Sequence, residues 1–264
     1  MCAVEVMELQ QSDVGLGPIQ IVVAVRNRPI YLWNCLDAIY RFTQTPHDVL
    51  LVDMASDDPM VARVSASFER RGLLSDVKVM SRNDPRLLEA FVFERMADLS
   101  PYFVYIEADA VLLDSGRCWL SQMADAMDRD AQLAMLGSAI DQRDFVDLER
   151  ARALSPDLDE PSLRALIKAD SPERLQSLES AEGKDIFYPH NPAGRLMMLR
   201  TEALRQVGGG TDGHLDHKFR QAGFSTGIMT GVRHRHMSLL HIFDEPLYDY
   251  GVRNSYMNTL DDPE

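Results

Sequence analysis

The sequence predicts an α/β fold in which helices flank a mostly parallel β-sheet and a helical insertion interrupts the chain. Two observations support this prediction. Short apolar runs alternate with helical patterns through the first half of the chain, and strands separated by helices form parallel sheets with right-handed crossovers. Of the 264 residues, 45% are hydrophobic and 26% are charged, so the chain can bury the core of one large domain.

Each predicted strand of the first half leads into a helical pattern. Residues 19–25 form a β-branched, apolar run, and after Pro29 apolar residues recur at helical spacing. The same alternation then repeats. The further predicted elements are strand 49–52, helix 59–71, strand 77–80, helix 87–99 and a fourth strand that ends at Glu107.

Polar side chains stand at the carboxyl ends of three of these strands. Arg26 follows the first strand, Asp53 follows the second, and Glu107 and Asp109 stand at the end of the fourth. Ligands of open α/β sheets bind outside these ends, so we expect the three clusters to face one crevice. Residues two apart on an extended chain project the same way, so Glu107 and Asp109 can reach one divalent ion or one ribose together. The alternative is a strand end whose acids face water.

The composition changes after a further predicted strand at 133–137. Residues 141–185 are rich in charged side chains with scattered leucines, which predicts a helical excursion. The excursion is either a lid over one side of the site or a solvated helical hairpin. A short helix from Thr201 is followed by three glycines at 208–210, a pattern typical of a helix C-cap and of a loop that a ligand can approach closely.

Two candidate functional groups follow the glycines. Asp216 is expected near the start of a helix that runs to Gln221, where helix-terminal N–H groups would keep it ionised and able to act as a base. The alternative is a plain helix-terminal acid. A strand predicted at 227–232 leads to His234 and His236, which alternation places on one side of the chain. This spacing suits metal ligation or phosphate contact, although lone histidines are more often structural.

Charge and cysteine content narrow the class of protein. The formal net charge of −14 argues against nucleic-acid binding and against a polybasic membrane anchor. The three cysteines are dispersed, which is typical of reduced structural thiols. The first 11 residues lack the pattern of a signal peptide, and no apolar stretch reaches the ~18 residues of a membrane span. We therefore expect a cytoplasmic protein without a transmembrane segment.

In chain order, four motifs resemble the family-2 glycosyltransferases of the GT-A fold. They are the segment VRNRP at 25–29, the segment LVDMASDD at 51–58, the triplet EAD at 107–109, and Gly208-Gly209 followed by Leu215-Asp216 and Gly223-Phe224. The resemblance covers about residues 18–236. It implies inverting transfer of a sugar from a nucleoside diphosphate donor to a saccharide or other hydroxyl acceptor.

The resemblance also implies roles for single residues. Those expected to contact the nucleotide and the donor are Val25, Arg26, Asn27, Asp53, Asn83, Glu107, Ala108 and Asp109. Asp109, with Glu107 and His236, is implied to bind a divalent metal ion, Mn²⁺ or Mg²⁺, at the diphosphate. Asp216 is implied to be the catalytic base that deprotonates the acceptor.

The chain departs from the family pattern at several positions. Glu107 stands where the family has Asp, so its longer side chain could bind the metal, the ribose or neither. Leu215 replaces the acid that normally precedes the base, and the short interval after the glycines makes Asp212 a rival of Asp216. The family's Asn-x-Gly segment is interrupted after Asn83, which puts the donor contacts of that segment in doubt.

The motifs divide the chain into parts with different expected roles. They are an amino-terminal arm at 1–17, a glycosyltransferase domain at 18–240 and a tail at 241–264. Within the domain we expect a nucleotide-binding half at 18–137, the helical insertion at 141–185 and an acceptor and catalytic half at 191–240. An oligomer is compatible with this division.

Two other functions stay open from the sequence. A nucleotidyltransferase that makes sugar nucleotides could use a similar scaffold, but the chain lacks an obvious Gly-rich phosphate loop with a basic residue near its start. A catalytically silent nucleotide-sugar binding module is favoured by the substitutions at Glu107 and Leu215. A glycoside hydrolase is excluded for the 107/109 pair, because residues two apart on one strand cannot flank a sugar ring.

Overall fold

The structure is a computed structural model that describes residues 17–96, 99–167, 169–179, 185–192, 195–209 and 212–237. The predicted arm, apart from Gly17, and the predicted tail lie outside the described residues, and so does Cys2. The two other cysteines, Cys35 and Cys118, are free thiols. Within the described ranges, no helix combines the length and the apolar character that a membrane span requires.

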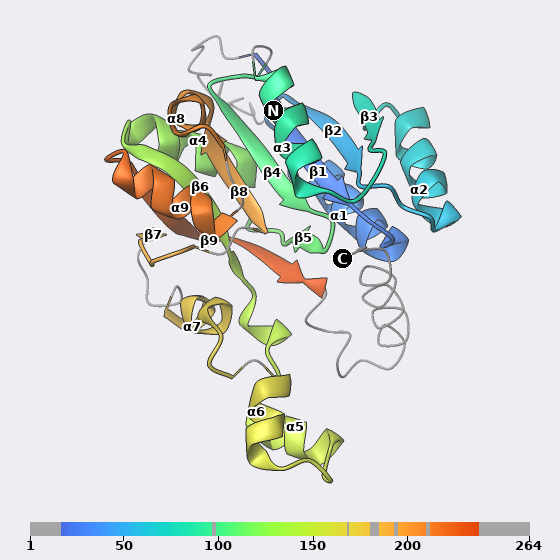
Figure 1. The fold of residues 1–264 in the computed structure, drawn as a ribbon, viewed down its shortest axis with the longest axis vertical. Helices are drawn as coiled ribbons and strands as arrows, with labels where there is room; N and C mark the ends of the chain where they lie inside the picture. Colours follow the sequence, from blue (N-terminus) through green and yellow to red (C-terminus); the bar gives the residue numbers. More distant parts are fainter. Residues whose placement is uncertain are drawn as a thin grey trace, which may run out of the picture.

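The first half of the chain follows the predicted alternation (Figure 1). Its elements are β1 (Ile19–Val25), α1 (Pro29–Phe42), β2 (His47–Asp53), α2 (Pro59–Arg70), β3 (Asp76–Val79), α3 (Pro85–Arg95) and β4 (Tyr102–Glu107). β1 pairs in parallel with both β2 and β4, and β2 pairs in parallel with β3. α3 starts earlier than predicted because Asp84 caps it by accepting the N–H of Arg86, and Pro85 fits its first position.

The second half completes the sheet and makes it mixed. Its sheet strands and covering helices are β5 (Ala110–Leu112), α4 (Trp119–Arg129), β6 (Leu133–Ile140), β8 (Leu196–Arg200), α8 (Thr201–Val207), α9 (Asp212–Gln221) and β9 (Ser225–His236). Eight of the described strands lie in the order β3-β2-β1-β4-β8-β6-β9-β5, and the ninth, the short β7 (Ile186–Phe187), pairs with β9. β8 is antiparallel to both of its neighbours, β4 and β6, so the sheet is less parallel than the sequence predicts.

The helical insertion explains the direction of β8. It contains η1 (Gln142–Asp144), α5 (Leu148–Leu154), α6 (Glu160–Leu166), α7 (Pro172–Glu179) and β7 (Ile186–Phe187), which confirms the predicted helical character. The Ser177 hydroxyl in α7 donates to the carbonyl of Ile140 at the end of β6, at 2.8 Å. The insertion therefore leaves and returns at the same end of the sheet, and β8 must run back along β6.

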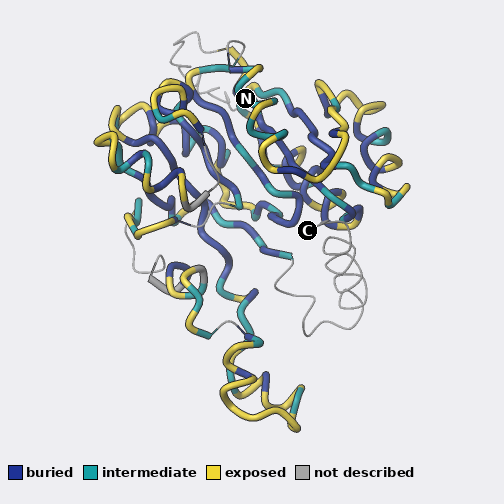
Figure 2. The backbone as a smooth tube through the Cα atoms, viewed as in Figure 1, coloured by how far each residue is buried: buried dark blue, intermediate teal, exposed yellow. Residues whose placement is uncertain are grey.

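α5 and α6 project from the rest of the molecule (Figure 1). They enclose a small apolar cluster of their own, formed by Ala151, Leu163 and Ile167. Most of their surface is exposed to solvent (Figure 2). This outer pair is connected to the sheet through η1 on one side and α7 on the other.

Two apolar layers cover the two faces of the sheet. α1, α2 and α4 pack on one face, and α3, α8 and α9 pack on the other (Figure 1). Strand β1 shows the consequence for the sequence, because Ile21 and Val23 belong to one layer while Val22 belongs to the other. A strand that is buried on both faces is apolar throughout, and its carboxyl end is the first place where polar residues can stand.

Candidate functional site

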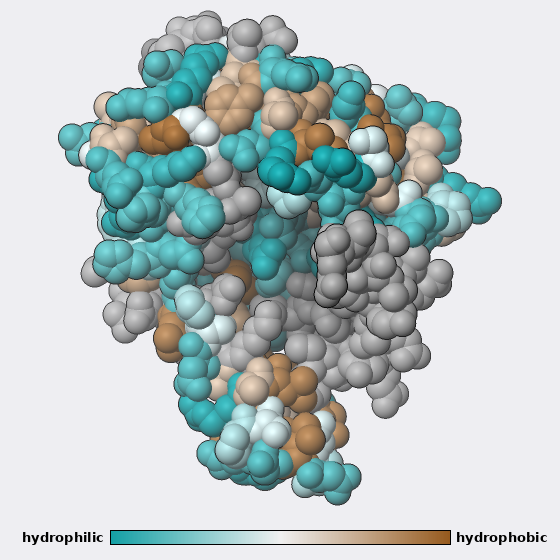
Figure 3. Space-filling model, viewed as in Figure 1, coloured by the Kyte–Doolittle hydropathy of each residue, from teal (hydrophilic) through white to brown (hydrophobic). Residues whose placement is uncertain are grey.

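A cavity of about 190 Å³ opens at the carboxyl ends of β1, β2 and β4. Five of the predicted donor-site residues line it, namely Val25, Arg26, Asn83, Glu107 and Ala108. Arg28, Met54 and Tyr105 complete its described wall together with Ala24. The surface is hollowed below α3, and hydrophilic residues line the visible part of the hollow (Figure 3). We name the cavity of about 190 Å³ the donor-side cavity, after the residues in its wall that the sequence predicts to contact the donor.

Asn27 and Asp53 build the loop behind this cavity. Asn27 is fully buried with φ of 48°, and its side-chain oxygen accepts the backbone N–H groups of Asp57 and Asp58, each at 3.0 Å. The carboxylate of Asp53 accepts the N–H of Ser56 at 2.8 Å, and the Ser56 hydroxyl accepts the N–H of Asn27. Neither Asn27 nor Asp53 lines the donor-side cavity in the structure.

Replacing Asn27 by alanine should destabilise the protein by about 1–3 kcal/mol. The N–H groups of Asp57, an exposed residue, and of Asp58, a half-buried one, would lose their acceptor, at a net cost of about 0.5–1.5 kcal/mol each because water can reach them, and alanine tolerates a positive φ less well than asparagine. Urea unfolding followed by circular dichroism measures the loss. Ser56→Ala is the matched control, since it removes one hydrogen bond from the same loop, and an equal loss in both variants would contradict the assignment.

Asp109 lies in the turn between β4 and β5 and is almost completely buried. Its Oδ2 accepts a hydrogen bond from Arg28 at 2.6 Å, and Nε2 of His236 lies 3.4 Å from the same atom. Burial alone would raise the pKa of Asp109, but His236 and the positive charge of Arg28 hold it well below its usual range. Asp109 is therefore ionised at neutral pH.

Glu107 has a different partner from Asp109. It is the last residue of β4, and its carboxylate forms an ion pair with Arg195. The expectation that the two acids project together from an extended strand is wrong, because β4 ends at Glu107 and the chain turns at residues 108–109. Sequence reasoning also missed Arg28 and Arg195, the two cations that the fold brings to these acids.

The donor set around Asp109 fits a divalent ion that shares its ligands with a diphosphate. The described residues hold no cluster of three or more His, Cys, Asp or Glu side chains arranged around one ion. However, nucleotide-bound Mg²⁺ normally takes one or two protein carboxylates and the phosphate oxygens. Asp109 and His236 meet this smaller requirement, and Oδ1 of Asp109 is buried without a hydrogen bond from any described residue.

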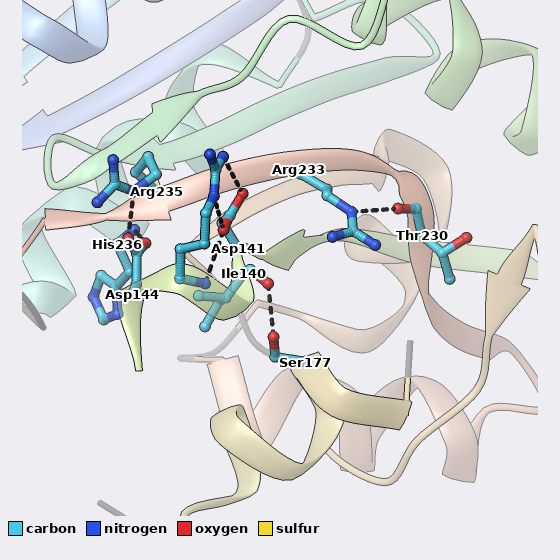
Figure 4. Close-up of polar contacts among 9 residues, drawn as sticks. Ile140, Asp141, Asp144, Ser177, Thr230, Arg233, Arg235 and His236 are labelled. Carbon is cyan, nitrogen blue, oxygen red and sulfur yellow. Dashed lines mark hydrogen bonds and ion pairs between the residues drawn. The ribbon is translucent and has the colours of Figure 1, made fainter. Parts of the chain in front are cut away.

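The strand that carries His236 is held in place by the root of the insertion (Figure 4). The buried carboxylate of Asp144 in η1 accepts the backbone N–H of His236 at 2.6 Å and also pairs with Arg235. Asp141 accepts the N–H of Arg143 and pairs with its side chain, which fixes η1 itself. Asp144 was not predicted from the sequence, although Asp141 and Asp144 stand directly after an apolar strand.

His234 has a different environment from His236. Its side chain is fully buried, and Nδ1 lies 2.7 Å from the hydroxyl of Ser138 on β6. Burial, with a smaller contribution from His236, lowers the pKa of His234 to about 3. The two histidines thus share one side of β9, as predicted, but they have separate partners.

The buried neutral His234 predicts a loss of stability in acid. Between its unfolded pKa of about 6.5 and its folded pKa of about 3, the unfolded chain binds more protons, so stability should fall as the pH drops through this window. Urea unfolding at pH 7, 6 and 5 measures the slope. In His234→Gln the slope should be shallower than in the parent, and an unchanged slope would contradict a neutral His234.

Asp216 lies in the middle of α9 rather than at its start. The helix begins at Asp212, so helix-terminal N–H groups do not hold Asp216, and that expectation is wrong. Instead its carboxylate accepts hydrogen bonds from Arg220 at 2.7 Å, from the Thr226 hydroxyl and from the N–H of Asn191 at 3.1 Å. Burial opposes ionisation, but these hydrogen bonds lower the pKa of Asp216 below its usual value.

Gly208 and Gly209, the described glycines of the predicted run, end α8 with left-handed backbone. Gly208 is the C-cap of α8, and both Gly208 and Gly209 have φ of 74°. Gly209 also lies against α3, where an added Cβ would come within 2.2 Å of the Phe93 ring. The rival base Asp212 is the first residue of α9, and its side chain is not among those described.

The comparison with known proteins concerns the fold. No protein-family model matches the sequence, and no curated protein sequence matches it significantly. Among solved structures, GalNAc-T7 in complex with UDP, GalNAc and Mn²⁺ superposes with a TM-score of 0.57 at 15% identity. The match covers 85% of this chain and 44% of that one, so the chain spans less than half of GalNAc-T7.

A second solved structure is similar over a larger share of its length. The mannosyltransferase PcManGT from Pyrobaculum calidifontis, in complex with GDP-Man and Mn²⁺, has a TM-score of 0.55 at 15% identity. This match covers 94% of the present chain and 73% of the mannosyltransferase. The fold is that of the GT-A glycosyltransferases. The donor-side cavity and Asp109 lie at the carboxyl ends of the parallel strands, the edge where open α/β sheets generally bind ligands.

Proposed function

We propose that the protein is an inverting glycosyltransferase that moves a sugar from a nucleoside diphosphate donor to a hydroxyl acceptor. The observation that carries the proposal is the ionised Asp109, which faces Arg28 and His236 beside the donor-side cavity of a GT-A fold. The buried Oδ1 of Asp109 has no hydrogen bond from the described residues, and this open position at the carboxyl ends of the strands favours a role in binding. The two similar structures are complexes with nucleotides or nucleotide sugars and Mn²⁺.

The nucleotide would occupy the donor-side cavity. Val25, Arg26, Asn83 and Ala108 line its wall, and this mixture of apolar and polar groups suits a base and a ribose. Asp53 would not contact the nucleotide directly. It would instead hold the loop behind the cavity in place through its hydrogen bond with Ser56. Glu107 is the acid of the wall that can accept hydrogen bonds from ribose hydroxyls.

The diphosphate would lie beside Asp109. A divalent ion held there by Asp109 and His236, with Glu107 as a further candidate ligand, would neutralise the charge that develops on the leaving diphosphate. Arg28 lines the same cavity and lies against Asp109, so its guanidinium is placed to contact phosphate oxygens. Arg195, paired with Glu107, adds a second positive charge near this end of the sheet.

Asp216 would remove the proton of the acceptor hydroxyl. The lowered pKa keeps it ionised, which a base requires, but the same hydrogen bonds reduce its basicity. Oδ1 is occupied by Arg220 and Thr226, whereas the described partner of Oδ2 is the N–H of Asn191. We therefore propose that Oδ2 of Asp216 accepts the proton of the acceptor hydroxyl.

A catalytically silent nucleotide-sugar binding module is the second candidate. It is favoured by the ion pairs that engage both acids of the triplet, Arg28 with Asp109 and Arg195 with Glu107. A nucleotidyltransferase is favoured by no contact in the described residues. The cytoplasmic location expected from the sequence stays a prediction.

One experiment separates these functions. The purified protein is incubated with UDP-, GDP- and TDP-sugars and with Mn²⁺ or Mg²⁺, and the release of nucleoside diphosphate is measured together with nucleotide binding by calorimetry. A glycosyltransferase should bind one donor and release its diphosphate. Binding without release, both alone and with a panel of acceptor alcohols, would leave the silent module. A parallel incubation with nucleoside triphosphates and sugar phosphates that released pyrophosphate would identify the nucleotidyltransferase.

A further inference from the structure

A second cavity, of about 410 Å³, lies between α3 and the sheet. Its wall is mostly apolar and includes Val92 and Phe93 from α3, Phe103 from β4, Leu199 from β8, Leu204 from α8 and Leu215 from α9. The volume lies within the range of small-molecule sites, which are typically apolar with a few polar groups. We name it the apolar cavity.

The apolar cavity adjoins the donor-side cavity. Tyr105 and Glu107 line both, so these two residues of β4 stand between them. Leu215, in the wall of the apolar cavity, is the residue before the proposed base Asp216. A molecule in this cavity therefore lies beside the donor and close to the helix that carries the base.

The chemistry of the wall selects the class of occupant. A sugar presents hydroxyl groups that would lose hydrogen bonds to water against an apolar wall, so the cavity does not suit the donor sugar or a polysaccharide chain. Two carboxylates line the cavity, but Glu107 is paired with Arg195, so the carboxylate of Glu89 is the one that disfavours an anion. A neutral aryl or short alkyl group fits both properties.

We propose that the apolar cavity binds the apolar part of the acceptor, a neutral alcohol with an aryl or short alkyl group. This inference rests on the proposed function, since it names the acceptor class for that reaction. The alcohol oxygen forms the new bond to the anomeric carbon, and the bond from that carbon to the diphosphate oxygen breaks. The nucleoside diphosphate leaves with the electron pair, and the alcohol proton goes to Asp216.

The test uses 4-fluorobenzyl alcohol as the probe and follows its fluorine resonance by NMR during titration with the full chain. Val92→Trp and Leu88→Trp fill the cavity from two positions of α3 that line it. Ala90→Trp is the matched control, because Ala90 is exposed on the same helix. The dissociation constant should rise on the order of tenfold or more in both filling variants and stay within about twofold in the control.

A charged analogue tests the role of the apolar wall and of Glu89. We expect 4-fluorobenzoate to bind more weakly than 4-fluorobenzyl alcohol, because the apolar wall does not solvate a carboxylate and the carboxylate of Glu89 repels it. Equal binding of both probes would contradict the assignment. So would higher thermal stability of the filling variants with unchanged probe binding, since the cavity would then be a packing gap under α3.

Bound Mn²⁺ and UDP test whether the probe lies beside the donor. The fluorine resonance of the bound probe should relax faster with UDP and Mn²⁺ than with UDP and Mg²⁺, because a nearby paramagnetic ion accelerates relaxation. Probe binding without this difference, in a protein that binds UDP and Mn²⁺, would overturn the inference and leave the proposed function standing. If UDP does not bind, the experiment is repeated with GDP and TDP. If none of the three binds with Mn²⁺, the proposed function fails, and the filling variants still decide whether the cavity binds the ring.

Discussion

Replacing Asp109 by alanine should abolish metal-dependent nucleotide binding. Asp109 is the acid that lies with His236, and Oδ1 has no hydrogen bond from the described residues, so it can take an ion without breaking an existing contact. Without the carboxylate, Arg28 and His236 would still face the diphosphate, but the metal would lose its main protein ligand. Calorimetric titration with UDP in Mn²⁺ should show a loss of affinity on the order of 10²-fold or more.

Two variants make the test specific to Asp109. Asp109→Asn keeps the shape of the side chain and should lose nearly as much affinity, because the lost property is the negative charge. Glu107→Ala should lose less, since Glu107 pairs with Arg195 rather than with His236. Each protein is checked for its fold by circular dichroism. A larger loss in Glu107→Ala than in Asp109→Ala would reverse the assignment of the metal ligand.

Asp216→Asn should stop the transfer reaction while nucleotide binding persists. If Asp216 accepts the acceptor proton, the amide cannot, and kcat should fall by a factor on the order of 10² to 10⁴. The substitution also removes the charge that compensates Arg220, so a stability loss of about 1–3 kcal/mol is expected alongside. Transfer kinetics at saturating donor, nucleotide calorimetry and urea unfolding are measured on the same preparation.

The structural role of Asp216 requires its own control, because its carboxylate also joins α9 to β9 through Thr226. Thr226→Val removes this contact but leaves the carboxylate ionised, so it should lower stability by about 1 kcal/mol and change kcat only a few fold. If kcat fell as far in Thr226→Val as in Asp216→Asn, the loss in Asp216→Asn could be explained by a displaced side chain rather than by the loss of a base. If Asp212→Asn lost activity and Asp216→Asn kept normal kcat, Asp212 at the start of α9 would be the base instead.

The parallel part of the sheet could be predicted because each of its strands leads into a helical pattern. β1 is apolar at consecutive positions, which is the mark of a strand buried on both faces. The direction of β8 could not be predicted, since it depends on where the insertion returns to the sheet, and no local pattern encodes that position. The same limit applies to the ends of helices, where capping residues such as Asp84 decide the first residue.

The sequence predicted which strand ends form the candidate site. It did not predict which side chains contact one another there. Arg28 and Asp109 are 81 positions apart, and Arg195 and Glu107 are 88 positions apart, so only the folded sheet brings each pair together. Local alternation placed His234 and His236 on one side of β9 but could not separate their roles. The difference arises from their neighbours, Ser138 for His234 and Asp109 for His236.

The separate apolar cluster of α5 and α6 has a consequence for how this protein can change over evolution. Substitutions among Ala151, Leu163 and Ile167 act on a core that is distinct from the two layers covering the sheet. Asp144, by contrast, fixes the backbone of His236 from the root of the same insertion. We therefore expect the outer helices to vary in sequence and length among related proteins, and the few residues that anchor the insertion to vary less, because they also hold β9 in place.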